Sequence, residues 1–187
     1  MINTHCDLVE MHFHCQLLIM KKEKERLCCH LHIPLQSASD KILKDMNRKY
    51  SSTDFLHKIG LLKRYFPDIA LTTDVICAFP TETDDDFNAT YDFLKDNEFA
   101  RIHVFPFSPR RGTKAYSLKR VYKNGQAKIR TDKLLQLSKE LERSYFERFL
   151  NTKRKAVSLR GNKALTDNYL TIENIEKHTG IFEVEIK

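Results

Sequence analysis

The stretch of sequence that decides the fold reads IALTTDVICAFPTETDDDF and covers residues 69–87. Its first half, residues 69–79, is rich in β-branched and apolar side chains and stops at Pro80, which predicts a strand. The near-continuous apolar character is typical of a parallel strand that is covered on both faces. The acidic run Asp84–Asp86 that follows favours the start of a helix, because the amino end of a helix attracts negative charge.

The same strand-then-helix pattern is repeated on both sides of this stretch. Upstream, a short apolar strand at residues 31–35 precedes a helix capped by Ser39 and a second helix opened by Ser51. That second helix carries apolar residues on one face, namely Phe55, Ile59, Leu62 and Phe66. Downstream, residues 101–107 form a further strand next to two prolines. The order β-α-β-α-β predicts an α/β fold with a parallel sheet or barrel.

The last third of the chain has a different pattern. Residues 127–150 predict one long helix whose inward side chains are Leu134, Leu137, Leu141, Tyr145 and Phe149. Three short alternating segments follow, at residues 155–160, 168–173 and 181–187, and predict a small antiparallel β-module. We therefore expect one part at residues 1–150 and a second, smaller part at residues 151–187.

Basic residues are concentrated in one part of the chain. The formal net charge is +7, and 16 of the 32 Lys and Arg lie in residues 108–160, against four Asp or Glu in the same range. Such a stretch is either the solvated face of a helix or a contact surface for nucleic acid. The composition alone leaves both interpretations open.

The cysteines and histidines show no metal-binding pattern, so the sequence predicts no metal site. The five Cys lack C-x-x-C and C-x-x-x-C-x-x-C spacing and are expected to be ordinary thiols. The irregular group His5, Cys6, His12, His14 and Cys15 does not change this prediction. No apolar run is long enough to span a membrane and no signal peptide is present, so the chain is expected in the cytoplasm with reduced thiols.

Polar or charged residues follow each of the three predicted strands, at the point where the strand ends. The three segments are residues 32–39, 73–82 and 104–113. Parallel βα folds bind their ligands at the carboxyl ends of the strands. The three segments therefore predict a ligand-binding rim on one edge of the sheet.

These segments resemble those of a known enzyme family. His32–Ser39, Asp74–Thr83 and Phe107–Thr113 are similar to the H-[LI]-P-x-Q-S-G-S, D-x-I-x-G-F-P-G-E-T and [YF]-S-x-R-x-G-T segments of the radical-SAM methylthiotransferases that modify tRNA. His103–Arg110 resembles the branch that acts on threonylcarbamoyladenosine. Thr166–Leu170 resembles a segment of that branch's carboxyl-terminal RNA-binding domain, the TRAM domain. The resemblance runs from about residue 2 to the end of the chain.

The resemblance implies the later strands of a partial (βα) TIM-type barrel, followed by a TRAM-like antiparallel β-barrel that contacts tRNA. It also implies S-adenosylmethionine and 4Fe–4S clusters as the cofactors of the full-length family. The residues that it places at the S-adenosylmethionine site are Gln36, Ser37, Ser39, Asp74, Val75, Ala78, Phe105, Phe107 and Arg110. The residues that it assigns to RNA contact are Arg110, Arg111, Lys153, Arg154, Lys155 and Tyr169.

The sequence departs from the family in two ways. The family's C-x-x-x-C-x-x-C, whose thiolates hold the radical-generating cluster, is absent. We therefore expect a fragment with no catalytic residue of its own, no bound cofactor and no activity alone. Ala38, Ala78 and Thr81 replace family glycines, and Thr81 would be strained if its position required a positive φ. The alternatives to a transferase fragment are a non-catalytic tRNA- or RNA-binding remnant and a decayed reading frame.

Overall fold

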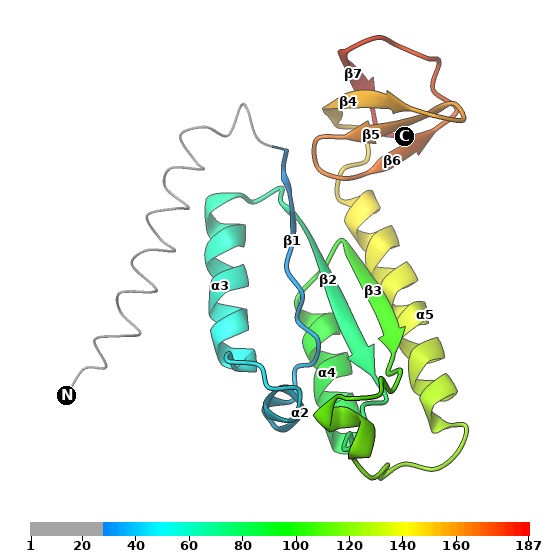
Figure 1. Cartoon of the computed structure of the whole chain (residues 1–187). Coiled ribbons are helices and arrows are strands. Elements are labelled where there is room, and N and C mark those ends of the chain that lie inside the picture. The colour runs from blue at the N-terminus through cyan, green and yellow to red at the C-terminus, as the bar shows by residue number, and fades with distance from the viewer. Residues whose placement is uncertain (1–27) are drawn as a thin grey trace, which may run out of the picture.

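The structure is a computed structural model and describes residues 28–187, so the His and Cys group before residue 16 lies outside the described residues. Its larger part contains a parallel sheet with the strand order β1-β2-β3 (Figure 1). The strands are β1 (His30–His32), β2 (Ala70–Cys77) and β3 (Arg101–Pro106). The helices are α2 (Asp40–Asp45) and α3 (Ser52–Tyr65) before β2, α4 (Asp84–Asp96) before β3, and α5 (Gln126–Glu147) after β3. The predicted α/β order is confirmed.

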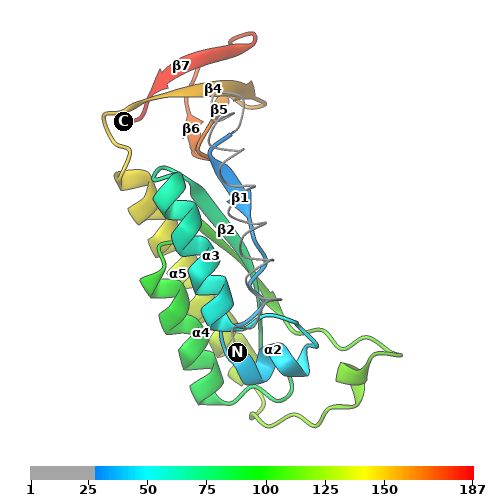
Figure 2. The ribbon, with the colours of Figure 1, turned by 90° about the vertical axis from the view of Figure 1, so that its left-hand side faces the viewer.

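Two capping boxes fix where α3 and α4 begin. The Ser51 side chain accepts a hydrogen bond from the Asp54 backbone N–H, and the Asp54 carboxylate accepts one from the Ser51 N–H. Thr83 and Asp86 do the same for α4. Such caps satisfy amide groups that the first helical turn leaves without partners. The apolar faces of α3, α4 and α5 then pack on one side of the sheet (Figure 2).

Among residues 28–187 no helix covers the opposite face of the sheet, here called the open face, and the expected cover on both sides stays a prediction. Side chains alternate along β2, so Leu71 and Val75 join the helix-side core while Asp74 and Ile76 lie on the other face and are half-buried. Thr72 lies on the same side as Asp74 but is 1% exposed, so this side is accessible only toward the carboxyl end of β2. This open face carries polar groups from all three strands.

The carboxyl-terminal part is a separate antiparallel sheet with the order β6-β5-β4-β7. Its strands are β4 (Lys153–Leu159), β5 (Lys163–Thr166), β6 (Thr171–Glu173) and β7 (Ile181–Glu185). The prediction of three strands was wrong because it missed β5, which follows β4 after the turn at Gly161 and Asn162 and pairs antiparallel with it. The predicted strand at residues 168–173 is also partly wrong, since only residues 171–173 pair and Tyr169 has φ +69° in a turn.

The two parts are joined by a shared core at the amino ends of the parallel strands. Ala70 and Ala100 pack in the same cluster as Phe149 of the connection and Ile172 of the module. Burial raises the pKa of Tyr145, whose hydroxyl donates to the carbonyls of Asp68 and Asn168 at 3.2 and 3.1 Å. The division at residue 150 stays a prediction. Over the described part of the chain, no helix combines the length and the apolar character that a bilayer crossing needs.

Candidate functional site

The three segments expected to form a rim meet at the carboxyl edge of the parallel sheet. The Gln36 N–H donates to the Asp74 carbonyl at 2.8 Å, and the Gln36 carbonyl accepts from the Ile76 N–H at 2.9 Å. On the other side, the Phe107 N–H donates to the Cys77 carbonyl at 2.8 Å. The backbone therefore ties the ends of β1, β2 and β3 to one another, as the rim prediction requires.

The polar residues after β1 are used inside the fold. Ser37 is fully buried, and its hydroxyl lies 3.2 Å from the Thr90 hydroxyl of α4. Ser39 donates to the Asp86 carboxylate at 2.7 Å and also caps α2. Partial burial alone would raise the pKa of Asp86, but hydrogen bonds from Lys41, Ser39 and Thr83 hold this pKa well below its usual range. A cofactor that used the two serine hydroxyls would compete with these bonds.

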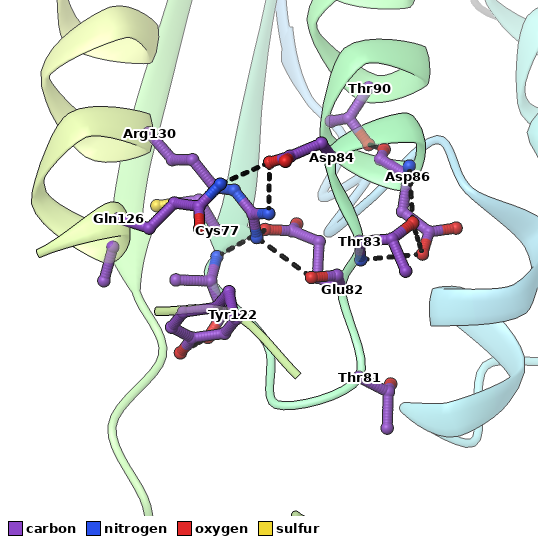
Figure 3. Close-up of polar contacts among 12 residues, drawn as sticks. Cys77, Thr81, Glu82, Thr83, Asp84, Asp86, Thr90, Tyr122, Gln126 and Arg130 are labelled. Carbon is purple, nitrogen blue, oxygen red and sulfur yellow. Dashed lines mark hydrogen bonds and ion pairs between the residues drawn. The ribbon is translucent and has the colours of Figure 1, made fainter. Parts of the chain in front are cut away.

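The segment after β2 is organised by a buried ion pair that the sequence did not reveal (Figure 3). Glu82 and Arg130 are 1% and 2% exposed, and an Arg130 guanidinium nitrogen lies 2.7 Å from Glu82 Oε2. Burial raises the pKa of Glu82, while the Ala78 N–H and Arg130 oppose that rise. Arg130 also reaches Asp84 at 2.8 Å, and Arg130 Nε has no hydrogen-bond partner in this buried site. This charged pair shapes the loop that leads from β2 into α4.

The backbone of Ala78 is held on both sides by this arrangement. Its N–H donates to Glu82 Oε2 at 2.8 Å, and its carbonyl accepts from the Tyr122 hydroxyl at 2.6 Å. Ala78 adopts φ +58°, a conformation that favours glycine, whereas Ala38 and Thr81 are not among the residues with positive φ. The backbone strain from a positive φ that was expected at Thr81 is therefore found at Ala78 instead.

The remaining expected cofactor residues are distributed over two faces of the sheet. Val75 is buried on the helix side, while Asp74 and the 50% exposed Phe105 lie on the open face. Phe107 packs against Phe79, with ring centroids 5.1 Å apart. Arg110 is exposed in the loop that follows β3. Gln36, Asp74, Phe105 and Phe107 therefore come from adjacent strand ends, and their roles stay predictions.

The expected RNA-contact residues lie at opposite ends of the parallel sheet. Arg110 and Arg111 are exposed beyond the carboxyl ends of the strands, and Lys153 and Lys155 are exposed on β4 of the module beyond the amino ends (Figure 1). Arg154 is mostly enclosed, since it pairs with Asp68 at 2.7 Å and its guanidinium carbon lies 4.6 Å from the Phe149 ring centroid.

Tyr169, the aromatic residue expected to stack on a base, already stacks within the chain. Its ring lies on that of His30, with centroids 3.8 Å apart and planes 5° from parallel. A base that stacked on the same face of Tyr169 would displace His30. Its role in RNA contact stays a prediction.

The chain is similar in sequence to proteins of known families. The Radical SAM superfamily profile matches residues 11–94. The threonylcarbamoyladenosine tRNA methylthiotransferase MtaB of Thermotoga maritima is 41% identical over 137 residues, which cover 73% of this chain and 32% of that protein. The tRNA-2-methylthio-N(6)-dimethylallyladenosine synthase of Clostridium tetani is 44% identical over 97 residues, or 52% of this chain and 21% of that protein. By sequence, the chain is thus similar to radical-SAM proteins and to tRNA methylthiotransferases.

The chain spans about a third of the length of the first of these methylthiotransferase relatives. Both kinds of relative, named for different modified adenosines, match at similar identity, so the branch within the family stays a prediction.

The described cysteines do not fit a 4Fe–4S cluster. They are Cys28, Cys29 and Cys77, and Cys77 is buried in the helix-side core beside the Thr131 hydroxyl at 3.2 Å. Burial raises the pKa of the Cys77 thiol, which disfavours the thiolate that a cluster needs. At the rim, the Ser37, Ser39 and Ala78 groups are also engaged by other residues. No catalytic step can be derived through either cofactor from these residues.

Proposed function

We propose that this chain supplies the later strands of a radical-SAM barrel and an RNA-binding, TRAM-like module for methylthio transfer to threonylcarbamoyladenosine in tRNA. The observation that supports this most is the joining of the three family segments at one sheet edge, through the backbone bonds of Gln36 and Phe107. The resemblance of residues 103–110 and 166–170 to the threonylcarbamoyladenosine branch supports the substrate. We place the activity in the cytoplasm.

S-adenosylmethionine and the iron–sulfur clusters belong to the complete reaction in this proposal. The sequence has no C-x-x-x-C-x-x-C, and Cys77 is buried, so these residues do not supply the three-cysteine site of a radical-SAM cluster. We therefore propose that the 187-residue chain alone is inactive. After anaerobic reconstitution with iron and sulfide, we expect an iron-free protein that forms no methylthio nucleoside.

Substrate recognition by the chain provides a test that does not need the cluster. The purified chain is titrated with three anticodon stem–loops that differ only in one base: threonylcarbamoyladenosine, dimethylallyladenosine or adenosine. We expect the tightest binding to the first. Equal affinities for all three would overturn the proposed substrate, and the absence of binding would overturn the proposed RNA contact.

A non-catalytic RNA-binding remnant is the second candidate, and the exposed basic residues of the rim loop and of β4 favour it. Phosphate contacts dominate such binding, so affinity falls steeply as salt is raised. If the chain is such a remnant, its affinity for RNA should fall in this way with salt and should be the same for all three stem–loops. A decayed reading frame predicts neither binding nor a cooperative unfolding transition.

A further inference from the structure

Three side chains that could bind a metal ion converge on the open face of the parallel sheet. His32, Asp74 and His103 come from β1, β2 and β3 respectively, and Asp74 lies directly opposite His103 in the strand register. One nitrogen or oxygen atom from each residue lies within 4.8 Å of the corresponding atoms of the other two. Three adjacent strands thus present two imidazoles and one carboxylate to the same point.

The spacing of these atoms suits a first-row metal ion. Zinc bonds to histidine nitrogen and carboxylate oxygen are about 2.0–2.2 Å long, so a tetrahedral ion holds its ligand atoms roughly 3.4 Å apart. His32 Nε2 and Asp74 Oδ2 are 3.4 Å apart. His103 has to approach the pair by an ångström or so, and its ring centroid already lies 5.8 Å from that of His32.

Thr72 supports the orientation of the His32 ring. This buried threonine places its hydroxyl oxygen 3.0 Å from His32 Nδ1 and 3.0 Å from His30 Nε2. When Nδ1–H donates to the hydroxyl, the lone pair of Nε2 faces Asp74 and is available to a metal. Histidines that bind metals commonly use their second ring nitrogen for such a bond, which fixes the tautomer.

A simple ion pair between His32 and Asp74 accounts for less of this geometry. The two side chains are 39% and 29% exposed, and an ion pair at that exposure contributes about 0–1 kcal/mol. It also gives no reason for a second imidazole at the same point. Two histidines with one carboxylate form a donor set that divalent transition metals favour.

We propose that His32, Asp74 and His103 form a binding site for one divalent transition-metal ion, with Zn²⁺ as the probe. The three side chains supply three ligand atoms, so a tetrahedral ion would have one further position for water or a ligand oxygen. The site differs from the cysteine-bound clusters of radical-SAM enzymes in its donor atoms. It shares Asp74 with the expected S-adenosylmethionine site, but its test does not require methylthiotransferase activity.

Cobalt(II) and zinc titrations of the whole chain test this site. Exposed thiols are first alkylated under native conditions, and binding is followed by Co²⁺ d–d absorption and by calorimetry with Zn²⁺. We expect one ion bound without a thiolate-to-cobalt charge-transfer band. His32→Ala and His103→Ala should each weaken that binding at least tenfold.

The matched control is His178→Ala, since His178 stacks on Phe182 in the β-module at a centroid distance of 4.3 Å. The His178→Ala variant should bind the metal ion with the same affinity and stoichiometry as the original chain. Circular dichroism melts confirm that each variant is folded before titration. Unchanged binding in His32→Ala and His103→Ala, or no binding by the original chain, would overturn the site. Neither result depends on RNA or on S-adenosylmethionine.

Discussion

At the scale of single residues, Arg130 is the side chain on which the loop after β2 depends. Its guanidinium bonds to the Glu82 carboxylate and carbonyl and to Asp84, and it lies 5.1 Å from the Tyr122 ring centroid. The pair is almost wholly removed from water. In such a site the cost of removing the charges from solvent offsets much of their attraction, so the loss of one partner costs more than the pair contributes.

Replacing Arg130 alone should therefore destabilise the protein strongly. Arg130→Met leaves the Glu82 carboxylate buried without its cation, and we expect a loss of about 3–5 kcal/mol in the free energy of unfolding. Urea unfolding measures it. Lys128→Met is the matched control on the same helix, because its pair with Asp132 is exposed and contributes only about 0.3–0.5 kcal/mol. The double variant Arg130→Met/Glu82→Gln should recover part of the lost stability. Equal losses of stability for Arg130→Met and Lys128→Met would contradict a special role of the buried pair.

Ala78 carries a backbone strain that glycine would remove. A left-handed conformation costs a residue with a Cβ about 1–2 kcal/mol, which glycine would not pay in the folded protein. The greater conformational freedom of glycine in the unfolded chain offsets part of this stabilisation. We expect Ala78→Gly to raise stability by up to about 1 kcal/mol. Ala38→Gly is the control, since Ala38 is not among the positive-φ residues, and it should lower stability. Thermal melts compare the two, and a loss in both would show that Ala78 is not strained.

At the scale of elements, α5 connects the parallel sheet to the β-module through Tyr145. The hydroxyl donates to one carbonyl before β2 and to one in the turn before β6. The side chain is 4% exposed. One buried hydroxyl thus holds two parts of the fold at the end of a long helix.

Removing that hydroxyl should weaken the contact between the two parts. Tyr145→Phe leaves two buried carbonyls with fewer donors, and we expect a loss of about 1–3 kcal/mol. Amide hydrogen exchange should become faster in β5 and β6, which contact this residue through the turn between them. Tyr116→Phe, at a side chain that is 51% exposed, is the control and should change neither quantity. Unchanged exchange in both strands would show that the hydroxyl does not couple the parts.

The same elements show which features the sequence could predict. The strand at Ala70–Cys77 and the helix at Ser52–Tyr65 follow from local apolar spacing and caps, and both are present. An apolar run does not say how many layers cover a sheet, so the cover of the second face of β2 stays a prediction. The strand Lys163–Thr166 was missed because it is four residues long.

The Glu82–Arg130 pair was missed for a different reason, since its partners are 48 residues apart. One local signal was available, because Arg130 continues the apolar spacing of Leu134, Leu137 and Leu141 along α5. A charged residue on a buried stripe implies a buried partner. The His32–Asp74–His103 cluster has no such signal, because it depends on the register of three strands.

At the scale of the whole molecule, the exposed basic residues form two groups at opposite ends of the parallel sheet. Arg110 and Arg111 lie beyond the rim, and Lys153 and Lys155 lie on the module. The 22 residues of α5 run between these ends, and at 1.5 Å per residue they span roughly 33 Å. A tRNA that contacts both groups must extend along the sheet, whereas a small RNA element reaches only one.

Paired charge variants should distinguish these two modes of binding. We expect Arg110→Ala/Arg111→Ala and Lys153→Ala/Lys155→Ala each to weaken tRNA binding. Each should also make the negative slope of log affinity against log salt less steep by about 1–2, because fewer phosphate contacts release fewer counterions. Fluorescence anisotropy across a salt series measures both quantities. Lys95→Ala is the control, since Lys95 is exposed in the last turn of α4 and belongs to neither group. With a short anticodon stem–loop in place of tRNA, only one of the two variants should still alter the slope. A quadruple variant that binds tRNA like the original chain would exclude both groups from the RNA contact.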